Sequence, residues 1–189
     1  MNYGQVRDAA LHLLNQYSVA GREIPASYNN QQDYLSAIPS LIDSAQMEIA
    51  TTVKPISVLK NVRADSHGLF PLPCNCYRFI GTEPRRDFRF VGERHFIVPG
   101  WKGSRILVEY HRYPHPMGEN PEDDKRLDNT PDTHYAIPYY VASRLVLDDD
   151  TYKQATLYNE WRTRLTELMP PVRVEKGPQF NVYANAIHE

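Results

Sequence analysis

The chain has 189 residues, enough for one domain with a substantial hydrophobic core or for two small lobes. Its apolar fraction of 41%, charged fraction of 23% and net charge of −2 exclude a wholly basic nucleic-acid-binding protein and a typical acidic disordered chain. The 15 prolines predict many extended connections, and the 13 tyrosines are typical of surfaces shared between subunits.

No stretch of the sequence approaches the ~18 apolar residues that span a bilayer, so we expect no membrane partner. The N-terminal residues MNYGQVRDAALHLL are expected to be helical and lack the features of a secretion signal. Two cysteines, Cys74 and Cys76, are too few for a disulfide framework, which favours synthesis in a reducing cytoplasm.

The N-terminal part of the chain predicts two helices. Apolar residues recur every three to four positions over residues 3–17, which predicts the first helix. The polar stretch 27–32 is expected to be a loop. A second helix follows from Tyr34 to Ile49, where Pro39 either kinks the helix or marks its restart. The two helices are expected to pack as a hairpin.

Between Pro55 and Tyr113 the apolar period changes from 3.6 to 2. Short β-branched and aromatic runs, separated by Gly, Pro or charged turns, predict an antiparallel sheet with one buried and one solvated face. Phe88 and Phe90 are expected to point together. The runs are SVLKNV, CYRFIG, DFRFVG, RHFIVP and SRILVEYHRY, and in the last of these Ile106, Val108 and Tyr110 share one face.

The C-terminal part begins with a polar segment, residues 114–129, that is longer than most loops in compact domains. The start signal Thr130-Pro131-Asp132 then predicts a helix, interrupted once at Pro138. A last helix is predicted to begin within residues 148–151 and to end before Pro170-Pro171. The remaining residues have no helical period and are expected to be extended.

Strands and helices in separate blocks predict an α+β fold. We expect an N-terminal helical hairpin, a small antiparallel β-sheet region, a C-terminal helix pair and an extended C-terminal tail. The expected boundaries are one helical lobe from residues 1–54 and 130–169, a β region at 55–113, a polar loop at 114–129 and a tail at 170–189.

The triple aspartate Asp148-Asp149-Asp150 is the most conspicuous candidate site. Adjacent carboxylates cannot all face one ion on a regular backbone, and the spaced acidic pattern of a calcium loop is missing. Aspartate is favoured at a helix N-cap and in the first helical turn, and the run lies where one helical pattern ends and another begins. We therefore interpret it as a helix start and not as a metal or catalytic cluster.

Other candidate sites carry no recognisable chemistry. Cys74 and Cys76 lack the further ligands of a zinc site, and the prolines around His111 and His115 exclude the helix that would align them. No nucleophile elbow, phosphate-binding glycine loop or dinucleotide fingerprint occurs in the sequence. We expect no catalytic residue, no metal and no cofactor, and hence no enzyme.

Charge is unevenly distributed along the chain. Residues 78–112 hold eight basic and four acidic residues, a net charge of +4, whereas residues 119–150 hold nine acidic and three basic residues, a net charge of −6. Two solvated faces would explain this pattern. Opposite surfaces that meet head to tail between copies of the chain would also explain it. The tail offers apolar groups that could add a strand or thread into a groove on another chain, or it is simply a disordered terminus.

The arrangement resembles the head–tail connector (adaptor) proteins of tailed bacteriophages, including the tail-tubular-protein-A type of short-tailed phages. The similarity rests on Asp33-Tyr34-Leu35, on Ile38-Pro39-Ser40-Leu41-Ile42 with Ala45, Glu48, Ile49 and Ala50, and on PDTHYAIPYYVASRLVLDDDTYKQATLYNEWRTRL near the C-terminus. It covers most of the chain up to about residue 168, and its motifs are patterns of helix packing.

The resemblance implies a structural virion protein, made in the host cytoplasm and located at the head–tail junction. Its copies would form a homo-oligomeric ring, commonly twelvefold, between the portal protein and the next tail or neck protein, and DNA would pass through the lumen without being read. The candidate portal-side or subunit-interface residues are Tyr135, Tyr139, Tyr140, Arg144, Tyr158, Trp161, Arg173, Phe180 and Tyr183.

Two alternatives to the adaptor differ in what they require. The first alternative is another ring protein of the same apparatus, a stopper or terminator. A terminator should be mostly β with a lone helix, whereas four helices are expected here. A glycan-binding module that uses aromatic residues such as Trp101 and Tyr110 is the other, and it would bind as a monomer and survive loss of the tail.

Overall fold

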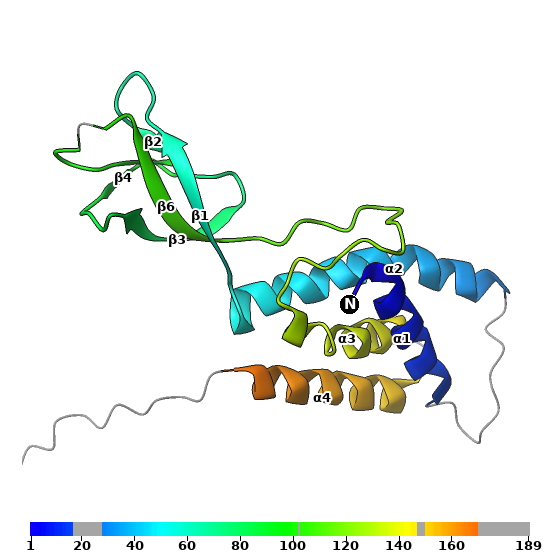
Figure 1. The fold of residues 1–189 in the computed structure, drawn as a ribbon. Helices are drawn as coiled ribbons and strands as arrows, with labels where there is room; N and C mark the ends of the chain where they lie inside the picture. Colours follow the sequence, from blue (N-terminus) through cyan, green and yellow to red (C-terminus); the bar gives the residue numbers. More distant parts are fainter. Residues whose placement is uncertain (17–27, 102, 147–149, 170–189) are drawn as a thin grey trace, which may run out of the picture.

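The computed structural model describes residues 1–16, 28–101, 103–146 and 150–169, which form a helical lobe and a β lobe (Figure 1). The predicted α+β class is confirmed. In chain order the described elements are α1 (Tyr3–Gln16), α2 (Tyr28–Glu48), the π-helical turn η2 (Ile49–Val53), β1 (Ile56–Arg63), β2 (Phe70–Pro71), β3 (Cys76–Glu83), β4 (Arg89–Val91), β5 (His95–Ile97), β6 (Arg105–Arg112), the 3₁₀ turn η3 (Pro131–Thr133), α3 (Ile137–Leu145) and α4 (Thr151–Leu168).

Helix α2 is longer than the sequence predicted. It begins at Tyr28, so the prediction of a loop over 27–32 is wrong for the part that the structure describes. Polar residues have only weak preferences against helix, and here they extend the helix ahead of its apolar stripe. The helix runs through Pro39 and widens into η2, where the Lys54 amide donates to the Ile49 carbonyl at 2.9 Å.

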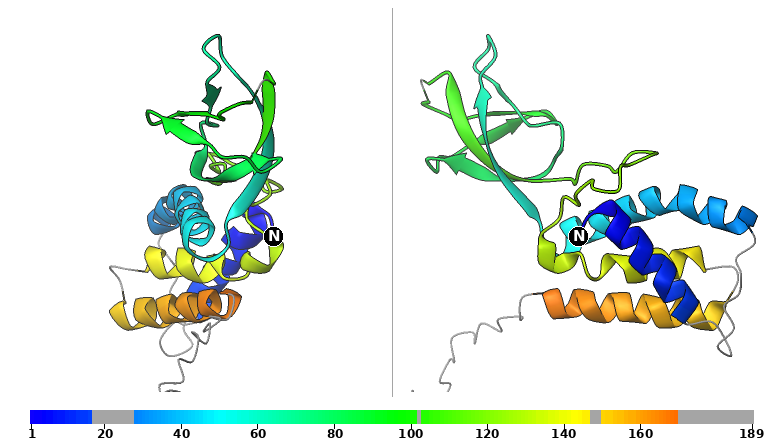
Figure 2. Two further views of the ribbon diagram at one scale, coloured as in Figure 1. Left: turned by 90° about the vertical axis from the view of Figure 1, so that its left-hand side faces the viewer. Right: turned by 45° about the vertical axis from the view of Figure 1, so that its right-hand side comes forward.

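Helix α3 is the centre of the helical lobe. Figure 2 shows α2, α3 and α4 in three layers, with α3 in the middle and α1 crossing them. The first two helices contact each other within one core, but each of them packs more extensively against α3. The sequence IPYYVASRL is apolar on nearly all sides, and a helix of that kind is stable only when it is surrounded.

The starts of the last two helices differ in how well the sequence predicted them. Helix α3 begins at Ile137, and the Thr130-Pro131-Asp132 signal instead opens the short turn η3, so the longer predicted helix is wrong. Pro138 lies in the first turn of α3, where no backbone donor is needed, and does not interrupt the helix. Helix α4 begins as predicted: the Asp150 carboxylate accepts from the Lys153 amide at 3.0 Å. Asp148 and Asp149 lie outside the described residues.

The helical core draws on both ends of the chain. Its largest buried side chains include Ile38, Ile42 and Ile49 from the first half and Leu157, Trp161 and Leu165 from α4. Segment 114–129 also contributes to this core, because Met117 and Leu127 are buried in it. The polar segment is therefore anchored on the helical lobe by two apolar side chains. None of the described helices is long and apolar enough to cross a membrane.

The β lobe contains two three-stranded antiparallel sheets, so the expectation of a single sheet is corrected. Their strand orders are β1-β6-β3 and β2-β5-β4. The strand β2 was not predicted, because it has only two residues and ends in a proline. Alternation along β6 is confirmed: Ile106, Val108 and Tyr110 are buried. These three side chains form a second core with Val62, Phe70, Phe96 and Val98.

Candidate interaction surfaces

Two of the predicted interface aromatics belong to the helical core. Trp161 is fully buried and Tyr140 nearly so, and their rings lie 5.2 Å apart. They were candidates because of the resemblance to adaptor proteins, but in the structure they form the contact between α3 and α4. The prediction that these two residues line a docking surface is corrected, because neither can reach a partner while the lobe is folded.

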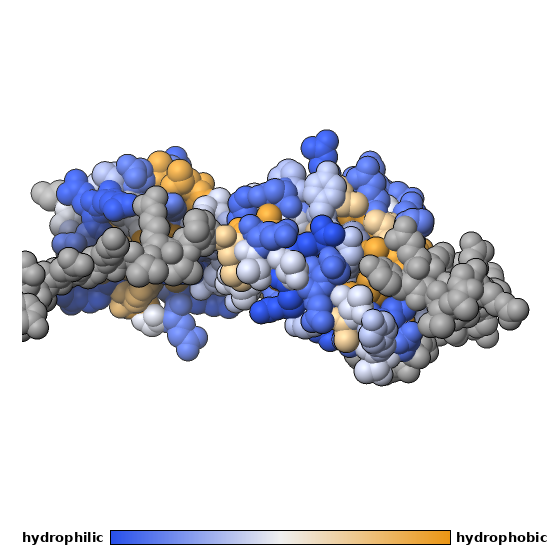
Figure 3. Space-filling view, turned by 90° about the horizontal axis from the view of Figure 1, so that it is seen from below, coloured by the Kyte–Doolittle hydropathy of each residue, from blue (hydrophilic) through white to orange (hydrophobic). Residues whose placement is uncertain are grey.

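The other described candidates lie at or near the surface. Tyr135 is 68% exposed, and Tyr139, Arg144 and Tyr158 are half-buried. The Arg144 guanidinium lies over the Tyr158 ring at 5.4 Å, and it also lies over the ring of Tyr140. Seen from below, this lobe presents mainly hydrophilic side chains (Figure 3). The structure thus brings Arg144 and Tyr158 together, whereas Tyr139 makes a separate pair with a residue of α4.

Sequence reasoning missed Arg164 in this cluster. Its guanidinium lies 4.2 Å from the centre of the Tyr139 ring and donates to the Tyr139 hydroxyl at 2.9 Å. The residue lies three positions after Trp161, on the α4 face that meets α3, but only the packing of α4 on α3 identifies its partner. The remaining candidates Arg173, Phe180 and Tyr183 lie outside the described residues.

A basic aromatic edge runs along the outer strand of the second sheet. We define it as Arg85, Arg86, Phe88, Arg89, Phe90 and Val91, all of them exposed; the exposed acid Asp87 lies among them and leaves the edge with a net charge of +2. Strand β4 pairs with β5 on one side only, so its other backbone edge is open. The Phe88 and Phe90 rings contact each other at 5.4 Å, as predicted, and both pack edge-on against Phe79.

The aromatic pair that suggested a glycan-binding platform is not exposed as a pair. Tyr110 lies in the core of the β lobe, and its hydroxyl donates to the Asn75 side chain at 3.3 Å. Trp101 is half-buried between the Arg86 guanidinium, 5.7 Å from its ring, and Gly103, where an added Cβ would lie 2.7 Å from the indole nitrogen. These two residues therefore offer no flat surface to a sugar.

A groove of about 900 Å³ lies between α1, α2 and segment 114–129. We call it the acidic groove, since its charged side chains are Asp43, Glu119, Asp123 and the single base Arg7. Arg7 is already paired, at 2.6 Å with Asp123 and at 2.9 Å with Asp8. Its apolar lining comes from Tyr3, Leu35, Pro39, Pro116 and Pro121, and uncharged polar groups come from Ser36, Ser40 and Asn120.

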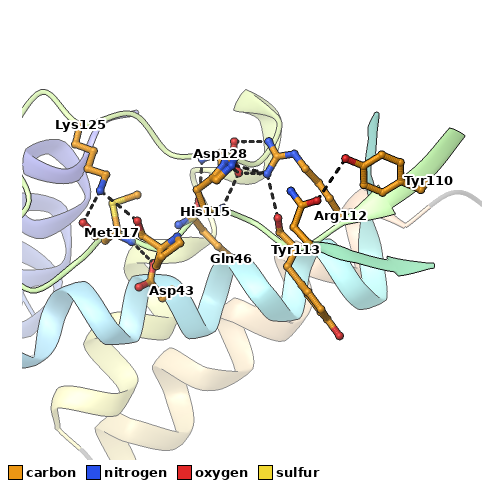
Figure 4. A network of polar contacts seen from close by, with 11 residues as sticks. Asp43, Gln46, Tyr110, Arg112, Tyr113, His115, Met117, Lys125 and Asp128 are labelled. Atoms are coloured by element: carbon orange, nitrogen blue, oxygen red, sulfur yellow. Dashed lines mark hydrogen bonds and ion pairs between the residues drawn. The ribbon is translucent and has the colours of Figure 1, made fainter. Parts of the chain in front are cut away.

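Segment 114–129 is held against α2 by polar contacts (Figure 4). The Asp43 carboxylate accepts from the Met117 amide at 2.7 Å, and Lys125 donates to the Met117 carbonyl at 2.5 Å. Burial raises the pKa of Asp43, although the Met117 amide and the nearby Lys125 charge oppose that rise. These bonds fix the far wall of the acidic groove.

An ion pair connects the last strand to the same segment. Arg112, at the end of β6, makes a two-pronged bond to Asp128, and the His115 amide donates to Asp128 at 2.8 Å. Burial alone would raise the pKa of Asp128, but the Arg112 and His115 bonds and charges outweigh it and lower the pKa to about 2. The Tyr77 hydroxyl adds a second link between the lobes by donating to the Ala50 carbonyl at 2.6 Å.

Within the described ranges, no group of three or more His, Cys, Asp or Glu side chains is placed to hold a metal ion. The thiols of Cys74 and Cys76 are free, the first exposed and the second half-buried at the start of β3. His111 packs against the Tyr77 ring, whereas His115 contacts Asp128, so the two histidines serve separate contacts.

The chain matches no model of a known protein family, and a search of curated proteins found no relative.

Proposed function

We propose that this protein is a structural virion protein, a head–tail adaptor that joins the portal to the tail of a bacteriophage. Copies of the chain would form a ring, commonly twelvefold, that continues the DNA channel without reading the sequence of the DNA. The partners would be further copies of the chain, the portal protein and the next tail or neck protein. The protein would be made in the host cytoplasm and function in the virion.

The main support for this proposal is the position in the structure of the residues that resemble the adaptor proteins. Ile38, Ile42 and Ile49 come from the first motif, and Val141 and Trp161 come from the C-terminal one. All five are buried in one core, although the β lobe separates the two motifs in the chain. The residues that carry the resemblance therefore belong to one packed lobe. This supports the adaptor function over the alternative that a short motif is shared by chance.

Two further features support a connecting role. The molecule has two lobes with separate cores, so it offers distinct surfaces to two different partners. Four helices among the described residues also favour the adaptor over a terminator, which should be mostly β. The burial of Tyr110 counts against the glycan-binding alternative, which relied on aromatics such as Trp101 and Tyr110.

Mass photometry of the protein mixed with the purified portal ring of the same virus tests the proposal. We expect full-length chains to add to the portal in a ring-sized multiple. A version ending at Met169, just beyond the end of α4, should fail to add if the tail is the anchor. If neither form associates with the portal and the full-length protein stays monomeric beside it, the adaptor function is wrong.

A further inference from the structure

We propose that the basic aromatic edge of one copy docks in the acidic groove of the next copy. The occupant of the groove is thus a second copy of this chain, presenting Arg85, Phe88, Arg89 and Phe90. This inference rests on the proposed function only in assuming that the copies assemble into a ring. The contact itself is argued from the two surfaces.

The edge has the composition of a binding hot spot. Aromatic and arginine side chains dominate the energetics of protein interfaces, and here they gather on the open strand β4 and on the residues just before it. Phe90 is 51% exposed although an aromatic ring gains much from burial. Contacts with Phe79 and Phe88 already hold its ring, so docking would cost little side-chain entropy.

The groove is complementary in both charge and polarity. Leu35 is 42% exposed at its wall, and Pro116 and Pro121 supply further apolar surface for an aromatic ring, whereas Tyr3 and Pro39 are buried beneath it. Residue Glu119 is exposed in the groove, whereas Asp123 is paired with Arg7, the one base among the lining residues. The three acids and Arg7 leave the groove with a net negative charge, so an incoming pair of arginines would be attracted to it, above all by the Glu119 carboxylate.

The edge and the groove of one molecule are too far apart to contact each other. In both Figure 1 and the right-hand view of Figure 2, β4 lies at the outer end of the β lobe, while the outer bend of segment 114–129 lies over the helical lobe. An edge that binds a groove on a neighbour leaves the neighbour's own edge free for the next copy. Such a head-to-tail contact repeats, and it closes into a ring when the rotation per copy allows.

Complementary variants test this contact. Phe90→Asp damages the edge and leaves the groove intact, whereas Leu35→Asp damages the groove and leaves the edge intact. We expect the wild-type protein to associate with rising concentration in sedimentation velocity, and each variant alone to associate roughly 30-fold more weakly, as for a hot-spot residue. An equimolar mixture of the two variants should form a 1:1 dimer and nothing larger, because only one edge and one groove per pair remain functional.

Matched controls separate the contact from a general effect of added charge. Leu59→Asp places the same charge at a 60% exposed site of the β lobe, and Met47→Asp does so at a 39% exposed site of α2. Both lie outside the two surfaces and should associate like the wild type. Circular dichroism of all four variants checks that they are folded.

Three outcomes would overturn the inference: a wild-type protein that stays monomeric at every concentration, single variants that associate like the wild type, or a mixture that stays monomeric. These outcomes are distinct from failure of the proposed function. Suppose that the protein binds the portal and that neither variant changes the assembled copy number. The adaptor function then stands, and the proposed contact is wrong. Suppose instead that the mixture forms a 1:1 dimer and that the wild type does not bind the portal. The proposed contact then stands, and the adaptor function is wrong.

Discussion

At the scale of single residues, Asp128 connects the two lobes more directly than any other described acid. It lies in segment 114–129 on the helical lobe, yet its partner Arg112 ends the last strand of the β lobe. Both side chains are largely shielded from solvent, so their bond is screened less than a surface ion pair would be. The pair is positioned to stabilise the relative arrangement of the lobes.

Replacing Asp128 by asparagine should lower the free energy of unfolding by about 2 kcal/mol at neutral pH, from the depression of its pKa. The folded pKa of about 2 lies below the ordinary value of 3.8, so the stabilisation is present above the ordinary value and is lost as the pH falls toward 2. Urea unfolding at several pH values measures this. The stability difference between wild type and variant should disappear at the acidic end, and a difference that persists there would contradict this account.

Asp124→Asn is the matched control for this measurement. Asp124 lies in the same segment and is exposed, so its replacement should change the stability by less than about 0.5 kcal/mol.

At the scale of elements, local signals predicted some boundaries and packing decided the others. Asp150 caps α4 through a bond three residues along the chain, which sequence alone can anticipate. The Thr130 signal is just as local, but the chain uses it for a 3₁₀ turn, because α3 must start later to place its apolar surface between α2 and α4. Tertiary packing overrode a valid start signal there.

The cap of α4 makes a direct prediction. Asp150→Ala should lower the free energy of unfolding by about 1 kcal/mol, since the Lys153 amide loses its acceptor. Asp150→Asn keeps a side-chain oxygen at the cap and should retain most of that stability. Thermal unfolding of the two variants compares them, and equal losses would show that the cap bond does not stabilise the helix.

Candidate surface residues were harder to predict than elements. Trp161 and Tyr158 both fit an aromatic stripe on α4, but only the contact with α3 decides that Trp161 is buried and Tyr158 half-exposed. The acidic groove could not be predicted, because its walls come from α1, α2 and segment 114–129, which are distant in sequence. The opposite charges of residues 78–112 and 119–150 were visible in the sequence, but their location on an edge and a groove was not.

At the scale of the whole molecule, each lobe has its own core. Trp161→Ala should destabilise the helical lobe by about 3–5 kcal/mol, and Phe96→Ala should do the same in the β lobe. Because the cores share no side chain, native-state hydrogen exchange should show the larger loss of protection in the lobe that carries the substitution. Equal loss in both lobes would mean that they unfold as one unit.

The most exposed candidate on the helical lobe can be tested against the portal. Tyr135→Ala should weaken portal binding while changing the stability by less than about 0.5 kcal/mol, because the side chain is 68% exposed. Tyr152, 84% exposed on α4, was not among the candidates, and Tyr152→Ala is the matched control. Mass photometry with the portal reads out both variants, and an equal effect of the two would argue against a specific role for Tyr135.

The pairing of β1 with β6 has a consequence for how this protein could diversify. The β lobe is an insertion between α2 and α3, and its first and last strand residues, Ile56 and Arg112, are direct neighbours in register. A short turn joining those two positions would close the helical lobe without stretching its backbone. We therefore expect the β lobe to tolerate lengthening, shortening or exchange while the helical lobe keeps its packing, so the two ends of the molecule could change their binding surfaces independently.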